Sequence, residues 1–422
     1  MNTIAPMAGR RILYINHYAG SPHHGMEFRP YYLAREWVRA GHVVQMLAAS
    51  YSHVRSKQPT AGGGHAIMRP TTERIDGIEY CWYPTPAYGG NGIGRVLNIW
   101  AFLRQLWTRS KDIVAAFRPD VVVASSTYPM DIWVARRLAR LCKAKLVFEV
   151  HDLWPLSPIE LGGMSPRHPF IRLCQRAEDT AYRDADVVVS MLPCVAGHMQ
   201  SHGLDVKRLH VVPNGISPDE WAGPLAPLQA DLRQHVEAER ERGRVVVGYA
   251  GSHGIPNALD HLLDAAALMR GEPLSFVLVG DGMEKARLQE RVAAAGLTNV
   301  RLFPPIPKAQ VPTFLSLIDM AYIGWLRSPI YRFGIAPNKL LDYMMAGRAV
   351  LHSVEAGNDP VAESGCGVAV APESPQAIAE GLRRLASLSP QERQEMGARG
   401  RAFVTAHHTY PVLARRFLEA CA

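Results

Sequence analysis

Short runs of valine, isoleucine and leucine alternate with amphipathic stretches along this chain, and that alternation limits its fold more than any other feature. Short runs that are apolar throughout are typical of strands buried on both faces, whereas apolar residues three or four positions apart are typical of helices. Strands and helices in alternation build βαβ units around a parallel sheet. The sequence therefore predicts an α/β fold with doubly wound parallel sheets.

The individual elements follow from this pattern. The expected strands occupy residues 11–16, 43–48, 121–125, 145–150, 187–190, 209–212, 245–250, 275–279, 300–303 and 320–323. Apolar residues at helical spacing occupy residues 28–40, 131–142, 257–270 and 283–295.

The chain has 422 residues, which is more than one hydrophobic core usually serves. After Pro213-Asn-Gly215, which has the chemistry of a turn, the pattern restarts with a charged helix at residues 231–242 and a new strand. We therefore predict one Rossmann-like domain at residues 1–213, a second at residues 214–408, and a terminal helix within residues 409–422. Doubly wound sheets bind ligands at the carboxyl ends of their strands.

Positive charge is concentrated in the first half of the chain. The residues up to Pro213 include 25 Lys and Arg against 16 Asp and Glu, and the remainder includes 21 against 22. This asymmetry fits an anionic partner, such as nucleic acid, an acidic lipid surface or a phosphorylated acceptor, but it also fits a role in solubility alone. Nucleic acid is a poor fit, because the sequence has no aromatic and basic stacking platform and no recognised nucleic-acid module.

The cysteines and the apolar runs bear on the compartment. Six cysteines are scattered without a C-x-x-C pair, which predicts buried thiols in a reducing compartment. Charged residues interrupt every long apolar run before the roughly 18 residues of a membrane span, and residues 1–11 lack an apolar stretch of signal-peptide length. We expect a cytoplasmic protein, and peripheral attachment to the inner face of the plasma membrane stays open.

The first expected strand leads into a long loop rich in glycine and histidine, and a helix begins near Pro30. A loop between the carboxyl end of a strand and a helix N-terminus is a place to bind an anionic ligand, and loops this long are usually functional. The loop lacks the G-x-G-x-x-G dinucleotide fingerprint. Its candidate ligand-binding residues are Gly20, His23, His24, Gly25, Glu27 and Arg29.

His151 and Asp152 directly follow the expected strand at residues 145–150. An imidazole and a carboxylate at the carboxyl end of a strand can act as a base or can hold an attacking hydroxyl. A histidine that is simply packed into the structure explains the dipeptide equally well.

Two glycine-containing loops repeat the strand, loop and helix arrangement in the second half. Glycine lets backbone N–H groups approach a ligand closely, so two such loops on one sheet edge indicate a ligand site. The candidate residues are Gly251, Ser252, His253 and Asn257 in one loop, and Gly280, Asp281 and Gly282 in the other.

The segment from Tyr331 to Gly347 carries the clearest signal for an anion. Pro337 suits the first turn of a helix and Gly347 its end, so the sequence predicts a helix at residues 338–346. The N–H groups at its start, with Lys339 beside them, would bind a diphosphate, and Asp342 would accept two hydroxyls of a nucleoside. The full candidate set is Arg332, Ile335, Ala336, Pro337, Asn338, Lys339 and Asp342.

Four segments together resemble glycosyltransferase family 4, and in particular its bacterial branch that builds O-antigens, capsules and exopolysaccharides. They are Gly25-Met-Glu-Phe-Arg29, His151-Asp-Leu-Trp-Pro155, Pro213-Asn-Gly215 and Pro337-Asn-Lys-Leu-Leu-Asp-Tyr-Met344. Each segment is short, but their combination is specific, and the resemblance runs from about Arg11 to about Leu418.

The resemblance implies a GT-B fold, in which two Rossmann-like domains face a cleft. It implies a retaining, metal-independent and cofactor-independent transfer of a hexose or N-acetylhexosamine from a nucleoside-diphosphate sugar, with UDP favoured over GDP. The acceptor would be a hydroxyl of a glycan or of a lipid-diphosphate-linked saccharide. The candidates in the first loop would bind this acceptor, those in the second half would bind the donor, and His151 and Asp152 would be catalytic. The last helix, at residues 411–421, would cross back to the first domain.

Two departures from the family pattern stand out. Many members carry two glutamates with seven residues between them; here Asp342 fills the second position but Gly334 fills the first. Many members also carry an arginine and a lysine in the first loop of the second domain, where this chain has Ser252-His-Gly-Ile-Pro-Asn257. We expect Lys339, helped by Arg332, to supply the missing positive charge, and backbone amides at residues 335–338 to replace the first glutamate.

Other function classes fit the same features. A sugar-nucleotide epimerase of this fold would consume the donor without an acceptor. A homologue without activity would bind the nucleotide sugar and release nothing from it.

The segment from Arg95 to Arg109 has two interpretations. An apolar helical face that lies beside basic residues fits either an anionic membrane surface or packing on the first sheet. The residues of that face are Val96, Ile99, Trp100, Leu103, Leu106 and Trp107.

Overall fold

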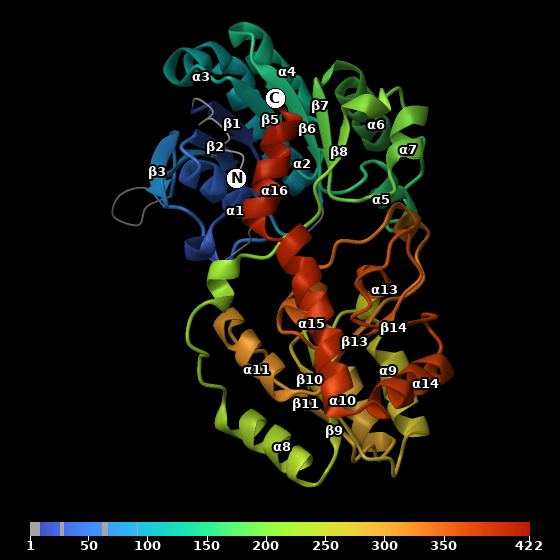
Figure 1. Cartoon of the computed structure of the whole chain (residues 1–422). Coiled ribbons are helices and arrows are strands. Elements are labelled where there is room, and N and C mark those ends of the chain that lie inside the picture. Colours follow the sequence, from blue (N-terminus) through green and yellow to red (C-terminus); the bar gives the residue numbers. More distant parts are fainter. Residues whose placement is uncertain (1–8, 26–28, 61–65, 91) are drawn as a thin grey trace. The chain divides into compact units, whose positions relative to one another are not determined.

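The computed structural model describes residues 9–25, 29–60, 66–90 and 92–422, and the chain divides into two compact units (Figure 1). Unit 1 contains the residues up to Pro213 together with Tyr410–Ala422, and unit 2 contains Asn214–Thr409. Each unit is built on its own sheet with helices around it, which confirms the expected pair of parallel-sheet α/β domains.

The sheet of unit 1 has the strand order β3-β4-β2-β1-β5-β6-β7-β8, and all neighbours are parallel except the β3–β4 pair. Its strands are β1 (Arg11–Ile15), β2 (Val43–Ala49), β3 (Thr71–Ile75), β4 (Ile78–Tyr83), β5 (Val121–Ala124), β6 (Lys145–Val150), β7 (Val187–Ser190) and β8 (Leu209–Val211). The antiparallel β3 was not among the expected strands and adds an edge hairpin to the expected parallel sheet.

Helices cover both faces of this sheet. One face packs on α1 (Arg29–Arg39) and on the C-terminal α16 (Tyr410–Ala420), where Trp37 Nε1 donates to the Ala414 carbonyl at 3.0 Å. The other helices of unit 1 are α2 (Ile93–Thr108), α3 (Ser110–Phe117), α4 (Asp131–Cys142), α5 (Leu156–Glu160), α6 (Pro169–Asp184) and α7 (Ala196–Ser201).

The sheet of unit 2 is parallel throughout, with the order β11-β10-β9-β12-β13-β14. Successive residues of the central strands enter two different cores: Val247 and Tyr322 pack on one face, and Val246 and Ile323 on the other. Its strands are β9 (Val245–Ala250), β10 (Leu274–Val279), β11 (Val300–Phe303), β12 (Met320–Gly324), β13 (Ala349–Ser353) and β14 (Gly367–Val370).

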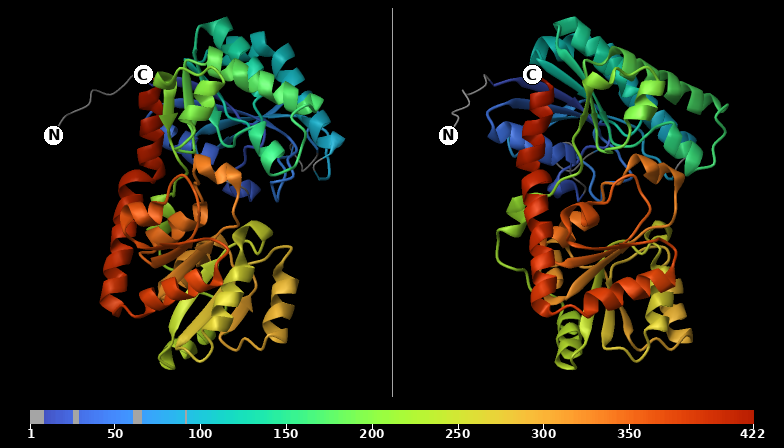
Figure 2. Two further views of the ribbon diagram at one scale, coloured as in Figure 1. Left: turned by 90° about the vertical axis from the view of Figure 1, so that its right-hand side faces the viewer. Right: turned by 45° about the vertical axis from the view of Figure 1, so that its right-hand side comes forward.

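The helices of unit 2 flank its sheet on both sides (Figure 2). They are α8 (Ala230–Glu241), α9 (Leu259–Leu268), α10 (Lys285–Ala294), α11 (Val311–Leu317), α12 (Asn338–Met345), α13 (Pro360–Ser364), α14 (Pro375–Ala386) and α15 (Pro390–His407). Within the described ranges, no helix of either unit is both long enough and apolar enough to cross a bilayer.

Each sheet has one point where the chain reverses the direction in which strands are added. In unit 1 this point lies between β1 and β5, and in unit 2 it lies between β9 and β12. Loops leave such neighbouring strands in opposite directions, so a crevice opens at their carboxyl ends. The ligand sites of the two units are therefore expected after β1, β5 and β6 and after β9, β10 and β12.

The expected apolar face of the helix at residues 95–109 is divided in the structure. Ile99 and Leu106 are buried against unit 1, whereas Trp100 is 59% exposed and Trp107 is 46% exposed. Asn98, which the helical wheel places opposite, is also buried and donates to the Pro86 carbonyl at 2.6 Å. Packing on unit 1 is therefore confirmed for Ile99 and Leu106, whereas contact with a membrane surface stays a prediction for the exposed residues.

Candidate donor and transfer sites

Unit 2 contains a cavity of about 710 Å³ at the carboxyl ends of β9, β10 and β12. The cavity lies at the switch point of the sheet, where a parallel α/β fold places its ligand. It is lined by Ala250, Gly251, Ser252, Asn257, Val279, Gly280, Asp281, Pro305, Ile306, Lys308, Val311, Trp325, Pro337, Asn338, Lys339, Asp342 and Tyr343.

The helix α12 begins in the wall of this cavity. Pro337 precedes its first residue, and no side chain of the described residues caps its N-terminus. The first N–H groups of a helix have no partner within the helix, and the helix dipole places partial positive charge there. An anion of the size of a phosphate group is the natural ligand for this end of α12.

Lys339 adds a full positive charge to the same place. Its Nζ lies 3.0 Å from Tyr249 Oη and 4.9 Å from the centre of that ring, and it donates to Asn257 Oδ1. No described carboxylate pairs with it, and burial lowers the pKa of Lys339 to about 8. The ammonium group is thus charged at neutral pH without a counter-ion, which favours an anionic ligand.

Asp342 lies one turn further along α12 and lines the same cavity. Burial raises the pKa of Asp342 to about 7, with Lys308 lowering it and Glu220 raising it. The carboxyl group is half-buried and stands on the cavity wall, where it can accept hydroxyl hydrogens.

Glycine is required where the two loops meet. A Cβ atom on Gly280 would lie 1.8 Å from the Gly251 carbonyl oxygen, so any larger residue would push the loops after β9 and β10 apart. Both loops reach the cavity wall because these backbones approach so closely.

Some expected donor residues lie away from the described cavity wall. His253 is fully buried, and burial lowers its pKa to about 4, so it packs behind the loop as a neutral ring. The guanidinium of Arg332 is exposed, donates to the Pro329 carbonyl and stacks on Phe333, which corrects its expected role beside Lys339. Gly282 is also outside the wall.

Two backbone groups near Gly334 are already engaged. The Ile335 N–H donates to Asn358 Oδ1 at 2.7 Å, and the Ala336 carbonyl accepts from Asn214 Nδ2 at 2.8 Å. The expectation that the Ile335 amide replaces a missing glutamate is therefore corrected, and the amides of Ala336 and of the residues from Asn338 onward remain candidates for that role.

In unit 1, His151 is held by a buried polar network at the ends of β5 and β6. Its Nε2 lies 2.8 Å from Ser125 Oγ and 3.3 Å from Glu149 Oε2, and Ser125 Oγ donates to Glu149 Oε2 at 2.6 Å. Tyr14 also donates its hydroxyl to Glu149. Because the Ser125 hydrogen is used on Glu149, this arrangement favours a hydrogen on Nε2 of His151 and leaves Nδ1 for a ligand.

Glu149 is the charged centre of this network. Burial alone would raise its pKa, but Arg29, His151 and Ser125 hold the pKa of Glu149 well below its usual range. Arg29 Nε lies 2.9 Å from Glu149 Oε1, and its other nitrogens donate to the Val212 carbonyl at 2.7 Å and the Pro213 carbonyl at 2.5 Å. Arg29 is thus a buried partner of Glu149, which corrects its expected contact with the acceptor.

Asp152 has a structural role in the loop after β6. Its Oδ1 accepts from the Leu153 N–H at 3.1 Å and from Ser157 Oγ at 2.6 Å, which fixes the start of α5. Glu149 and Ser125 orient the His151 ring, which corrects the expectation that Asp152 does so, while a contact of Asp152 with the acceptor stays a prediction.

The first loop supplies few exposed candidates. His24 is buried against Trp82 with its Nδ1 2.9 Å from Ser21 Oγ, and Gly20 is buried with its carbonyl bonded to Tyr80. Both are corrected from acceptor contacts to parts of the core. His23 and Gly25 are exposed, and Glu27 lies outside the described residues.

Glu149, Ser125 and Tyr14 are site residues that the sequence reasoning missed. The available signal was the charge itself: a glutamate inside an otherwise apolar strand, Leu-Val-Phe-Glu-Val, must be paired when both faces of that strand are buried.

Comparison with known proteins points to one family. Residues 24–215 match the family model of the glycosyl transferase 4-like domain, and residues 244–387 match that of glycosyl transferases group 1. The putative colanic acid biosynthesis glycosyl transferase WcaI of Escherichia coli (strain K12) is 25% identical over 260 residues, which cover 59% of this chain and 62% of that protein. The chain thus matches less than two thirds of the length of this relative.

Two further proteins extend the comparison. The probable glycosyltransferase WbjE of Pseudomonas aeruginosa is 23% identical over 301 residues, which cover 70% of this chain and 72% of that protein. The crystal structure of HepE from Anabaena in complex with UDP and glucose has a TM-score of 0.64 at 15% identity, with 98% of this chain and 99% of that chain covered. The likeness to HepE shows a shared fold. The paired family domains and the two relatives establish that this chain belongs to glycosyltransferase family 4, with the GT-B fold.

Proposed function

We propose that the protein transfers a sugar from a nucleoside-diphosphate sugar to a hydroxyl of a glycan or lipid-diphosphate-linked saccharide in bacterial cell-surface polysaccharide biosynthesis. The observation that carries this proposal is the Lys339 ammonium group, which has no described carboxylate partner and stands beside the uncapped start of α12 in a cavity wall. The colanic acid protein among the relatives supports the class of product, and the UDP in the HepE complex supports UDP as the nucleotide.

The proposed chemistry follows from the charges. Negative charge develops on the diphosphate as the glycosidic bond breaks, and preorganised positive groups lower that barrier most effectively. The N–H groups of α12 and Lys339 supply them without a metal ion. The acceptor hydroxyl attacks the face from which the diphosphate leaves, so the configuration is retained, and His151 Nδ1 contacts the reacting sugar.

A panel of nucleotide sugars tests the donor. A bound donor stabilises the folded chain, so the matching nucleotide sugar should raise the melting temperature while the other sugars leave it unchanged. The same panel is then incubated with and without oligosaccharide acceptors. Release of the nucleotide only in the presence of an acceptor is expected. Isomerised donor without an acceptor would indicate an epimerase, and binding without any release would indicate a homologue that has lost activity.

We also propose that unit 1 binds the surface of an anionic bilayer through α2. Trp100 and Trp107 are exposed on this helix, as are Ile93, Val96 and Leu97. Trp107 also lines a cavity of about 710 Å³ whose basic residues are Arg136, Arg137, Arg140, Arg176 and Arg183. Exposed tryptophans beside arginines fit an interface where acyl chains meet anionic headgroups. A lipid-linked acceptor would be presented at such a surface.

Vesicle sedimentation tests this contact. The chain should sediment with phosphatidylglycerol vesicles at low salt and stay in solution with phosphatidylcholine vesicles. The double substitution Trp100→Glu and Trp107→Glu should reduce the bound fraction several-fold. Leu161→Glu is the matched control, because Leu161 is an exposed apolar residue of α5's C-cap in the same unit and should not matter. No sedimentation at low salt, or an equal loss in the control, would remove the proposed contact.

A further inference from the structure

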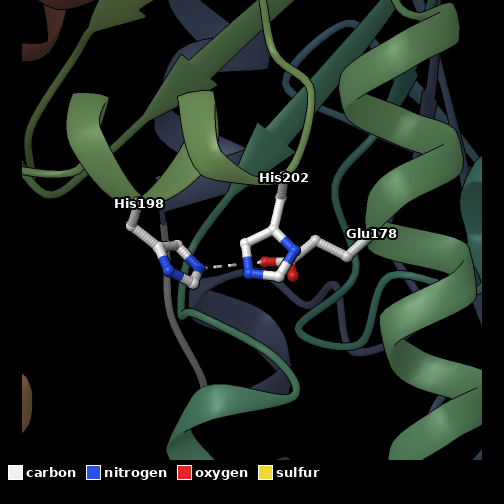
Figure 3. Close-up of side chains that lie close together, drawn as sticks. All are labelled: Glu178, His198 and His202. Carbon is white, nitrogen blue, oxygen red and sulfur yellow. Dashed lines mark ion pairs between the residues drawn. The ribbon is translucent and has the colours of Figure 1, made fainter.

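Two histidines and a glutamate of unit 1 converge between α6 and α7, and none of the three is assigned above to donor binding or transfer (Figure 3). His198 lies in α7 and His202 is its C-cap, so the two rings are four positions apart on one side of a short helix. Glu178 comes from the adjacent α6. One potential ligand atom of each residue lies within 4.8 Å of those of the others.

The distances are close to those of a bound metal ion. His198 Nε2 lies 3.7 Å from Glu178 Oε1. Two ligand atoms at about 2.0–2.1 Å from a tetrahedral zinc ion are roughly 3.3 Å apart, so small side-chain rotations would complete the geometry. Two histidines at positions i and i+4 with a carboxylate from a second helix form a recurring zinc-binding arrangement.

Glu178 has the environment of a carboxylate that needs a cation. It is 2% exposed, and its oxygens accept from Tyr182 Oη at 2.8 Å and from Gln175 Nε2 at 2.9 Å. No lysine or arginine among the described residues pairs with it. A buried carboxylate is normally paired with a cation or bound to a metal ion.

The surroundings also prepare His202 as a ligand. Its Nδ1 lies 3.2 Å from Asp179 Oδ1 and 3.0 Å from Gln175 Nε2, and Gln175 Nε2 also donates to the Asp179 carboxylate at 2.8 Å. Histidines that bind metal ions commonly donate their other ring N–H to a carboxylate, which fixes the tautomer and the ring orientation. Because Asp179 and Gln175 both engage Nδ1, His202 Nε2 is left as the ligand atom.

We propose that Glu178, His198 and His202 bind one zinc ion, with a water molecule as the fourth ligand. Imidazole nitrogens favour zinc over magnesium or calcium, which prefer oxygen ligands throughout. The ion would fasten α7 to α6 and so brace the segment that leads from β7 to β8. Zinc at this site would take no part in the proposed sugar transfer. The transfer itself is still expected to need no metal ion.

Titration of the metal-free full chain with zinc chloride tests the site. Affinity tags are removed first, and the chain is depleted with a chelator. One equivalent of zinc should bind, and an excess should raise the melting temperature by about 5 °C, whereas magnesium chloride should not. Both effects should be lost in His198→Gln and His202→Gln, and both should persist in His407→Gln, which replaces an exposed histidine of α15.

Cobalt(II) provides a readout that does not depend on the variants. Six free cysteines could also bind zinc, but cobalt bound to thiolates gives intense charge-transfer bands that imidazole and carboxylate ligands do not give. We expect the visible bands of a four-coordinate site with nitrogen and oxygen ligands. Thiolate bands, binding without a fixed stoichiometry, or unchanged binding in the two histidine variants would overturn the proposal.

Discussion

Replacing Lys339 by alanine should raise the dissociation constant of the nucleotide sugar about 30-fold or more. A hydrogen-bonded contact between an ammonium group and a phosphate contributes roughly 2–3 kcal/mol, and each 1.4 kcal/mol corresponds to a factor of ten. Lys339 is one of two lysines in the cavity wall and the one without a described carboxylate partner. Calorimetric titration of the variant with the donor measures the effect.

Lys308→Ala is the matched control for this loss. Lys308 lines the same cavity, but its Nζ is 2.8 Å from Glu220 and its side chain is 55% exposed. We expect less than a threefold change there, since exposed ion pairs contribute little. Lys339→Ala should unfold at the same or a higher temperature, because burial lowers the pKa of Lys339 and its charged form thus weakens the folded state. Unchanged donor affinity in this stable variant would refute the assignment.

The same lysine gives donor binding a pH dependence. The pKa of Lys339 is about 8 in the free protein, and a bound diphosphate stabilises the ammonium form and raises it. Donor affinity should therefore fall as the pH rises through 8. The pKa of Asp342 is about 7, so the carboxylate form that accepts hydroxyls best is lost as the pH falls through 7. Affinity should be highest between these values, and Lys339→Ala should lose the alkaline decline only.

The parallel core of both sheets could be predicted from the sequence because buried strands are apolar on both faces. The expected strand at residues 145–150 coincides with β6, and every other expected strand lies within a residue or two of an observed one. The hairpin of β3 and β4 escaped prediction because Thr71–Ile75 is a half-exposed polar edge strand. The inner strand β13 and the edge strand β14 were also missed. The sequence Ala-Val-Leu-His-Ser of β13 ends in polar residues, and Gly-Val-Ala-Val of β14 consists mostly of small residues, so neither resembles the longer apolar strands.

The donor site could be predicted further than the transfer site. Pro337 directly precedes α12, and Lys339 and Asp342 lie on that helix, so local rules place the three together. Arg29 and Glu149 are 120 positions apart, and only the strand order brings their side chains together. Asp152 looked like the partner of His151 because it is adjacent in sequence, but the strand end turns it toward Ser157 instead. Sequence adjacency therefore misled where the contacts depend on the tertiary fold.

The second large effect concerns His151. Its Nε2 is committed to Ser125 and Glu149, so the ring is held in one orientation with Nδ1 left for the reacting sugar. His151→Ala should lower kcat about 100-fold, which corresponds to the roughly 2–3 kcal/mol of a hydrogen bond that is strong only in the transition state. The dissociation constant of the donor should change less than threefold, because the described wall of the nucleotide cavity consists of unit 2 residues. Rapid-quench turnover and donor titration measure the two quantities separately.

Two variants separate transfer chemistry from packing. His151→Asn keeps a short polar group at the strand end and should recover part of the lost kcat. Asp152→Asn still offers an oxygen to the Leu153 N–H and to Ser157 Oγ, so both kcat and the melting temperature should stay close to those of the unaltered protein. If Asp152 were a catalytic carboxylate, the same substitution would greatly lower kcat. Equal losses of kcat and donor affinity in His151→Ala, together with a lowered melting temperature, would instead mean that the Ser125–Glu149–His151 network only supports the fold of unit 1.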